Sequence, residues 1–518
     1  MGNKENITGN KRLIINMSSN IMSYSSTILI SFVLTPYLIN TLGKEAYSFY
    51  PLANNFVNYM SVLTSALNSM ASRFITIEIA QKKYNEANRY FSSILFANVI
   101  MTAVLSLPML FIVIFLDKFL QVPINLIGSI KLLFSFVFAS MLVNVVTSVF
   151  GVATFAKNRI DLRSFSELVT AILRIILFVV FFKFFQPEIF YVGIVALIIS
   201  LINFLFQTQF TRLLLPEIHI SKNMFSKNYV KIILSSGVWN SVNQIGALLL
   251  SSTSLLLANV LYGASAAGSY SIVQTVPNFI NGLVSMLASV FIPIVIYKYA
   301  QKDKEGMLNE LNKSQKLIGV FSTSVIAVFI GLSYEFFTLW TPNEDPQYLF
   351  VLSTVTILPH FIIGSVWPVS NLNVVMNHVK IPAMYMLFSG LTNIVTVIII
   401  DKIASPSVIV IPIISTIIQI MWVGVFIPQY PCAKLQISRY YFYPPIIKSL
   451  FGGVICISFT YFIKYFVPVT SWLMFFTVGI FCGLFALCLN FCMQFGINET
   501  GKKILVLKNV VKNTISAK

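Results

Sequence analysis

The sequence predicts an all-α polytopic membrane protein with 14 transmembrane helices. Of its 518 residues, 57% are hydrophobic and only 10% are charged, and its mean hydropathy is +0.83, which is more apolar surface than a soluble domain buries. The charged residues are confined to short islands between apolar runs of about 20 residues, the length at which a helix crosses a bilayer core. A third observation is that much of the sequence recurs after 220 residues.

Fourteen apolar runs delimit the predicted helices. In chain order they occupy about 13–40, 47–75, 92–116, 130–155, 164–184, 189–211, 232–261, 267–297, 317–339, 347–375, 381–400, 405–428, 445–466 and 470–495.

Most of the 35 Lys and Arg residues fall on the side of the membrane that holds both termini, which the positive-inside rule assigns to the cytoplasm. The basic residues expected on the opposite side are Lys44, Lys118, Lys131, Lys183, Lys402 and Lys464. The net charge of +18 therefore reflects orientation in the bilayer, and no nucleic-acid partner is expected.

The first 12 predicted helices form two six-helix halves of the same topology. A shift of 220 residues places Gly43 on Gly263 and the island "AQKKYNEANRY" at 80–90 on "AQKDKEGMLNE" at 300–310. Because six is an even number, both halves enter from the cytoplasm, which is a parallel repeat about the membrane normal. We expect an N-terminal lobe at 1–215, a cytoplasmic linker at 216–231, a C-terminal lobe at 232–430, two additional helices at 431–495 and a basic cytoplasmic tail at 496–518.

Helices 1, 2, 7 and 8 each carry polar residues on one face, at spacings of three and four. The candidate substrate-binding residues on these faces are Asn16, Asn20, Ser23, Asn54, Asn58, Asn240, Asn243, Gln274, Asn278 and Asn281. Polar side chains that face lipid lack partners, so such faces normally contact protein or water. Hydrogen bonding between helices is one interpretation, and the matching register of four helices favours a wet central cavity between the halves.

The remaining helices are more apolar. "ILRIILFVVFFKFF" at 172–185 and "TNIVTVIIIDKI" at 392–403 are expected to contact lipid or to pack outside the bundle. The last two helices, rich in Phe and Cys, show no polar stripe, and they could form an apolar groove for a lipid tail or extend the packing surface. The five cysteines contain no C-x-x-C pair and are expected to be packing residues. No metal and no cofactor is expected.

Two arginines inside predicted helices are functional candidates, because a charge at the centre of a bilayer costs about 3 kcal/mol or more. Arg174 lies near the middle of the fifth helix, where it contacts substrate or pairs with Glu167 on the same face. Arg73 lies at the cytoplasmic end of the second helix, where it snorkels to the interface or lines the mouth of a cavity. Helices 1, 2, 7 and 8 contain no Asp or Glu, so the cavity suits an anionic group such as phosphate, which arginine matches well.

Three stretches carry a resemblance to a known family. "YLINTLGKEAYSFYPLANNFVNYMSVL" at 37–63 resembles the passage from helix 1 to helix 2 of Wzx-type polysaccharide biosynthesis (O-antigen) flippases, within the multidrug/oligosaccharidyl-lipid/polysaccharide exporter superfamily. "SRFITIEIAQKKYNEANRYFSS" at 72–93 is similar to the loop after helix 2, and "GVATFAKNRIDLRSFSELVTAILRIILFVV" at 151–180 to the passage from helix 4 to helix 5.

The resemblance implies a MATE-like fold and alternating access between two lobes. It also implies translocation of a polyprenyl-diphosphate-linked oligosaccharide across the bacterial inner membrane, for O-antigen, capsule or exopolysaccharide synthesis. In this family basic residues of the N-terminal lobe meet the diphosphate, and Arg73 and Arg174 are the positions that fit. The lipid bilayer, a glycan polymerase and a chain-length regulator are the expected partners.

Two other functions compete. A drug or cation antiporter of the same fold typically carries a carboxylate in helix 1 or near helices 7 and 8, and none is present there. A membrane glycan polymerase or glycosyltransferase would have a large outer loop or a D-x-D pair, and neither occurs. No G-x-x-x-x-G-K-[ST] phosphate loop is present either, so we expect a transporter and not an enzyme.

Overall fold

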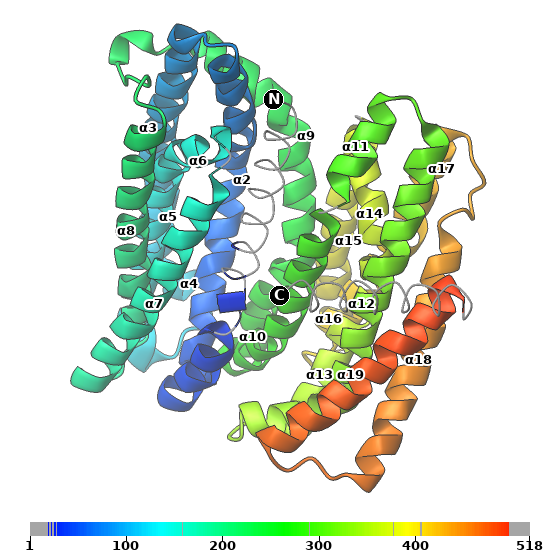
Figure 1. Cartoon of the computed structure of the whole chain (residues 1–518). Helices are drawn as coiled ribbons and strands as arrows, with labels where there is room; N and C mark the ends of the chain where they lie inside the picture. The colour runs from blue at the N-terminus through cyan, green and yellow to red at the C-terminus, as the bar shows by residue number, and fades with distance from the viewer. Residues whose placement is uncertain are drawn as a thin grey trace, which may run out of the picture. The chain divides into compact units, whose positions relative to one another are not determined.

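Every secondary-structure element of the described residues is helical in the computed structural model (Figure 1). The structure describes residues 19, 22, 25, 26, 28, 30–157, 159–289, 291–376, 378–404 and 407–496. These residues form two compact units, which divide between Ser271 and Ile272.

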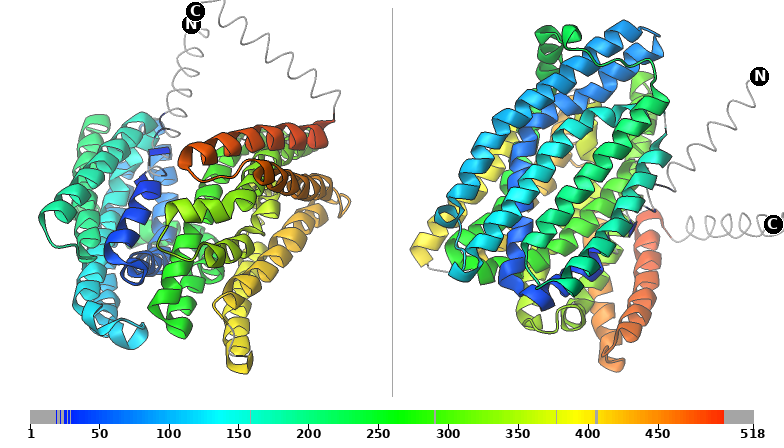
Figure 2. Two further views of the ribbon diagram at one scale, coloured as in Figure 1. Left: turned by 90° about the horizontal axis from the view of Figure 1, so that it is seen from below. Right: turned by 90° about the vertical axis from the view of Figure 1, so that its left-hand side faces the viewer.

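The long helices of the first unit run side by side in the right-hand view of Figure 2. They are α2 (Lys44–Ala80), α3 (Tyr84–Ile114), α5 (Ile127–Phe150), α7 (Ile160–Phe184), α8 (Phe190–Leu214) and α9 (Lys227–Ser251), joined by the short α4 (Leu116–Phe119) and α6 (Val152–Ala156) and the 3₁₀ turns Ile124–Leu126 and Lys222–Met224. One of the cores of this unit packs Leu67, Ala71 and Ile75 of α2 against Phe91 and Ile94 of α3. α10 (Thr253–Ser289) crosses from the first unit to the second.

The second unit contains the end of α10 and all later helices. They are α11 (Ile292–Ala300), α12 (Lys304–Trp340), α13 (Pro346–Ile357), α14 (His360–Val375), α15 (Lys380–Ala404), α16 (Val410–Met421), α17 (Ile427–Leu435), α18 (Tyr443–Phe466) and α19 (Trp472–Phe495), with a π-helical turn at Trp422–Phe426. Pro359 precedes α14, and because proline cannot donate a backbone hydrogen bond, the predicted helix at 347–375 is two shorter helices.

The chain is a multi-pass membrane protein. Among the described residues, 11 helical stretches are long and apolar enough to cross a bilayer. One of them, Val238–Ala288, covers two of the predicted helices, and it contains the non-helical Gly263. The predicted helix at 47–75 corresponds to α2, which is not among the 11, and the described end of the predicted first helix is the short apolar helix Ile30–Leu42.

Two turns recur with the same backbone geometry 220 residues later in the chain. Gly43 and Gly263 have φ of 82° and 88°, a conformation that glycine adopts without a Cβ penalty. Lys82 and Lys302 both have φ of 59°, and the amides of Lys83 and Asp303 donate to the carbonyls of residues five positions earlier, at 2.9 and 3.1 Å. The repeated letters of the sequence therefore coincide with repeated turns.

The last two helices carry a buried polar face. On α18, Ser449, Cys456 and Thr460 are buried at spacings of seven and four, so they share one side of the helix. Gln494 of α19 donates to the Ser449 hydroxyl at 3.1 Å, and Asn490 donates to that of Ser324 at 3.1 Å. The expectation that these helices lack a polar stripe was wrong, because the buried face of α18 carries small polar residues and that of α19 carries the amides Asn490 and Gln494, four residues apart.

Candidate functional site

Some polar side chains of α2 form hydrogen bonds to the backbone of their own helix. Asn54 is half-buried and its side-chain amide donates to the carbonyl of Tyr50 at 2.9 Å. The Ser61 hydroxyl donates to the carbonyl of Asn58 at 2.8 Å. The side chain of Asn58, between them, is exposed.

α9 and the start of α10 pack against α2, and polar side chains of α2 form hydrogen bonds to both. The hydroxyls of Ser65 and Ser241 lie 3.1 Å apart, and the Asn55 side chain donates to the carbonyl of Ser252 at 3.0 Å. The Tyr59 hydroxyl meets that of Thr253 at 3.0 Å. These contacts extend over three turns of α2, so part of the polar pattern serves helix association.

Three of the candidate amides on α2 and α9 are exposed outside that contact, and we call these residues, Asn58, Asn240 and Asn243, the amide face. All three side chains are exposed, and none donates or accepts a hydrogen bond among the described residues. The pairing of residue 55 with 252 and of 65 with 241 sets the two helices antiparallel. With a rise of about 1.5 Å per residue, Asn58 and Asn243 then lie within about 10 Å of each other along the helix axes.

Between residues 238 and 250 of α9, the exposed residues fall on two different faces. Val238 and Ile245 are 46% and 38% exposed and seven residues apart, so they share one side. Asn240 and Asn243 lie on the other side, since two residues correspond to a rotation of about 200°. An aliphatic side suits acyl chains, whereas exposed amides without partners would be unfavourable there. The amide face therefore has the chemistry of a surface that contacts water or a polar ligand.

Neither candidate arginine makes an ion pair with a described residue. Arg174 is half-buried on α7, and Glu167 is not its partner, because that carboxylate accepts from Arg163 at 3.0 Å. Arg73 is exposed near the end of α2. Neither arginine has a hydrogen bond to the amide face among the residues that the structure describes.

The candidate residues of the second unit lie on the later part of α10. Asn278 is exposed, and Gln274 and Asn281 are half-buried. Their spacings of four and three place them on one face of the helix. Asn16, Asn20 and Ser23 lie outside the described residues.

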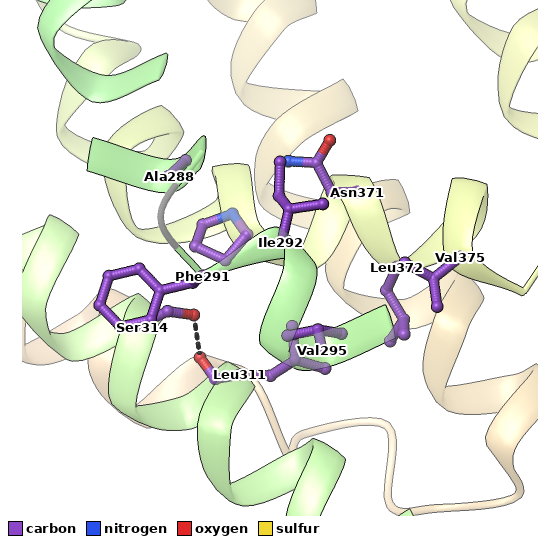
Figure 3. Close-up of a pocket in the computed structure, with 10 residues that line it drawn as sticks. Ala288, Phe291, Ile292, Val295, Leu311, Ser314, Asn371, Leu372 and Val375 are labelled. Atoms are coloured by element: carbon purple, nitrogen blue, oxygen red, sulfur yellow. Dashed lines mark hydrogen bonds between the residues drawn. The ribbon is translucent and has the colours of Figure 1, made fainter. Parts of the chain in front are cut away.

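A small cavity lies beside the break between α10 and α11 (Figure 3). Its lining is mostly aliphatic, with polar atoms from Ser314 of α12 and Asn371 of α14, and its volume is about 10 Å³. That is room for about one water molecule, so the cavity cannot hold a sugar. In the described parts of the chain, no group of three or more His, Cys, Asp or Glu could hold a metal.

One buried residue that was not predicted from the sequence supports α2, the helix that carries Asn58 of the amide face. Asn98 of α3 is fully buried, and its amide donates to Asn68 of α2 at 3.0 Å, to the carbonyl of Val145 at 3.0 Å and to Ser148 of α5 at 3.2 Å. A single Asn in the apolar run 92–116 is the signal that could have identified it. Through these bonds Asn98 holds α2 against α3 and α5.

Comparison with known proteins identifies relatives of the whole chain. The uncharacterized membrane protein EpsK of Bacillus subtilis (strain 168) is 28% identical over 463 residues, which cover 89% of this chain and 91% of that protein. The structure of the lipid II flippase MurJ in an inward closed conformation is similar, with a TM-score of 0.64 and 14% identity over 93% of this chain and 98% of that chain.

An inward-facing multidrug resistance MATE family transporter is also similar, with a TM-score of 0.55 and 13% identity over 96% of this chain and 99% of that chain. The solved structures share the fold, and they are transporters and not enzymes. Residues 13–298, more than half of the sequence, match the family of polysaccharide biosynthesis proteins. The chain therefore belongs to the polysaccharide biosynthesis protein family.

Proposed function

We propose that this protein is a flippase that moves a polyprenyl-diphosphate-linked oligosaccharide from the cytoplasmic to the outer leaflet of the bacterial inner membrane. The observation that carries the proposal is the amide face: Asn58, Asn240 and Asn243 are exposed and without hydrogen-bond partners among the described residues. Amides both donate and accept hydrogen bonds, as sugar hydroxyls do. Membership of a polysaccharide biosynthesis family supports a glycan as the ligand.

The proposed fold is two six-helix parallel repeats followed by two helices. The matching turns at Gly43 and Gly263 and at Lys82 and Lys302 support the repeat. Counting Ile30–Leu42, α2 and both parts of Val238–Ala288 as membrane helices brings the 11 apolar stretches to the 14 proposed. Both termini would then lie in the cytoplasm, with lobes at 1–215 and 232–430.

The mechanism we propose is alternating access. The sugar and diphosphate enter a polar cavity formed by the faces of helices 1, 2, 7 and 8, while the polyprenyl chain stays in the bilayer. The protein replaces the hydration of the head group with hydrogen bonds, because bare hydrocarbon would impose a large desolvation penalty on its hydroxyls and charges. Gln274, Asn278 and Asn281 would extend the cavity lining.

The diphosphate would be met by Arg73 and Arg174. Both guanidinium groups lack a carboxylate partner in the described structure, so their charge is available to an anion. Residues 46–77 of α2, and all of α9 and α10, contain no Asp or Glu, which favours an anionic head group over a cationic drug. O-antigen, capsule and exopolysaccharide repeat units share this chemistry, and a glycan polymerase and a chain-length regulator would act on the product.

The test is transport by the purified protein in liposomes, with a fluorescent polyprenyl-diphosphate oligosaccharide and an impermeant quencher or glycosidase outside. Replacing all three residues of the amide face by Leu should reduce the flipping rate at least ten-fold without loss of folded protein. Val238→Ala and Ile245→Ala, on the other exposed side of α9, are the matched controls and should leave the rate unchanged. Full activity of the triple variant, or proton- or sodium-coupled export of a cationic dye by the unaltered protein, would refute the proposal.

A further inference from the structure

A groove runs along the first unit between α3 and α9, with α2 as its floor. Its volume is about 320 Å³, within the range of about 300–1,000 Å³ that is usual for small-molecule sites. Leu67 of α2 is 1% exposed at the bottom, while Ile100 and Val104 of α3 are 57% and 55% exposed at the rim. Val230 and Leu234 of α9 form the facing wall. The groove is therefore open to the surroundings along its length and apolar inside.

The start of α9 is held against α3, and this sets the position of the groove. The backbone amide of Ser226 donates to the hydroxyl of Ser93 at 3.0 Å, and the rings of Phe96 and Phe225 meet edge to face, 6.4 Å apart. Lys227 follows at once as the first residue of α9 and lines the groove. The lysine is therefore at the end of the groove where α9 enters the membrane.

Among the described residues that line the groove, Lys227 alone is charged. Its side chain is exposed and forms no ion pair among the described residues, and Lys222 and Lys231 close by are exposed as well. Glu86, in the same region, is engaged by Arg89 and by the hydroxyl of Tyr229. An apolar slot with a basic end complements a molecule that has a hydrocarbon chain and an anionic head.

The groove and the amide face lie on opposite sides of α9. Lys227, Leu234, Val238 and Ile245 follow one another at spacings of seven, four and seven, so they share the side on which α9 exposes aliphatic residues. Asn240 lies about 200° of rotation from Val238. A ligand in the groove is therefore separate from a head group at the amide face, which argues for a resident lipid and against the transported one.

We propose that this groove binds an anionic phospholipid, with one acyl chain between α3 and α9 and its phosphate against Lys227. With the orientation proposed above, the lysine lies at the cytoplasmic leaflet. There, basic pockets between transmembrane helices attract anionic head groups. The lipid covers the Leu67 floor and connects α3 to the first turn of α9, the helix that carries two of the three exposed amides.

The experiment measures lipids that remain bound to the intact full-length protein. The protein is released from nanodiscs of equal parts phosphatidylglycerol and phosphatidylcholine, and bound lipid is quantified by native mass spectrometry. Lys227→Gln should reduce bound phosphatidylglycerol about five-fold, the effect expected for one lysine near an anionic surface, whereas Lys302→Gln, at an exposed lysine that does not line the groove, should not. Ala97→Leu should fill the groove and displace both lipids, whereas Ala103→Leu, on the exposed side of α3, should not.

Two results would overturn the proposal. One is equal retention of phosphatidylglycerol by Lys227→Gln and Lys302→Gln. The other is complete displacement of phosphatidylglycerol by an equimolar polyprenyl phosphate, which would make the groove a site for the carrier lipid. Both readouts are lipid occupancies and do not require transport, so their failure would leave the flippase proposal to its own assay.

Discussion

The second helix of each repeat starts and ends alike, yet only one of the two is continuous. α2 runs without a break over 37 residues between Gly43 and the turn at Lys82. Its counterpart lies between Gly263 and the turn at Lys302, but it is described as two helices: α10 ends at Ser289, and α11 begins at Ile292 with a proline in its first turn. The residue 220 positions after Arg73 is that proline, Pro293.

The comparison points to one position at which the two helices carry different residues, Arg73 and Pro293. Proline removes a backbone donor and clashes with the preceding turn, so it often breaks a helix, although α2 and α10 accommodate Pro51 and Pro277 inside them. In the second unit the break lies beside the small cavity near Ser314 and Asn371, where side chains leave space for about one water molecule. In the first unit the same stretch of helix carries an arginine and packs Ala71 and Ile75 into the core.

The largest effect on stability is expected from placing the proline of the second unit at the equivalent position of the first. Arg73→Pro should destabilise the first unit by about 3 kcal/mol or more, because it places proline inside a continuous helix. Arg73→Ala, which keeps the helix, is the control and should retain wild-type stability. Thermal unfolding of the purified protein, followed by size-exclusion fluorescence, measures the difference, and equal melting temperatures for the two variants would show that α2 tolerates a break as α10–α11 does.

The two units also differ at the position of Asn98, which is a buried amide in the first unit and an aliphatic residue in the second. Asn98→Leu should cost about 2 kcal/mol, because Asn68 and Ser148 lose a buried partner. The residue 220 positions later, Ile318, is 1% exposed in the second unit. Ile318→Leu, at this apolar counterpart, should change stability little. Denaturation midpoints measure both, and an unaffected Asn98→Leu would contradict the role of this amide in holding α2.

In the second unit, small residues allow helices to approach closely, and Gly364 is the sharpest probe. A Cβ built at Gly364 would meet the hydroxyl of Ser322 at 1.9 Å, whereas one at Gly483 of α19 has no neighbour within 4 Å. Gly364→Ala should therefore destabilise the protein by about 1–3 kcal/mol through overpacking. Gly483→Ala should be neutral. Comparable melting temperatures for the two variants would mean that α12 and α14 are not so closely packed.

The smallest effect is expected at the turns that the two halves share. Asp303 caps α12 by accepting from the Gly306 amide at 2.8 Å and pairs with Lys298 at 2.9 Å. These two contacts lower the pKa of its carboxyl, the Lys298 contact being the larger cause. Because the folded pKa is below the unfolded one, the stabilisation is present at neutral pH and is lost as the pH falls below the ordinary range of an aspartate.

Asp303→Asn should therefore lower the melting temperature slightly at pH 7 and have no effect near pH 3. Lys83 occupies the equivalent position before α3 and caps nothing with its side chain, so Lys83→Asp should supply the missing cap and raise the melting temperature slightly. Melting curves at both pH values test the two variants. A pH-independent difference at Asp303, or a destabilising Lys83→Asp, would contradict the cap.

The sequence predicted the features that depend on residues close together in the chain, namely the repeated turns and the polar face of α2. Glycine at 43 and 263 and the island that recurs at 80–90 and 300–310 share backbone turns because identical residues favour identical torsion angles. The polar stripe of α2 was predicted from its spacing. The partner of that stripe was not, because periodicity places Ser65 on a face but cannot say that Ser241 lies opposite it.

Other features have weaker signals in the sequence. Asn98 is a single polar residue, and one residue has no periodicity. Ser449, Cys456 and Thr460 form a face that is evident only when small residues are counted together with amides. The expected pairing of Arg174 with Glu167 does not form, because Glu167 pairs with Arg163 instead. Arg163 lies one turn from Glu167 and is therefore closer along the helix surface.

The hydrogen bonds of α2 to α9 and the start of α10 have a consequence for biogenesis. Asn55 and Tyr59 obtain their partners from residues 252 and 253, which leave the ribosome almost 200 residues later. Until those residues are made, the side chains of Asn55 and Tyr59 lack these hydrogen-bond partners. Completion of the first unit is therefore tied to synthesis of α9 and the start of α10.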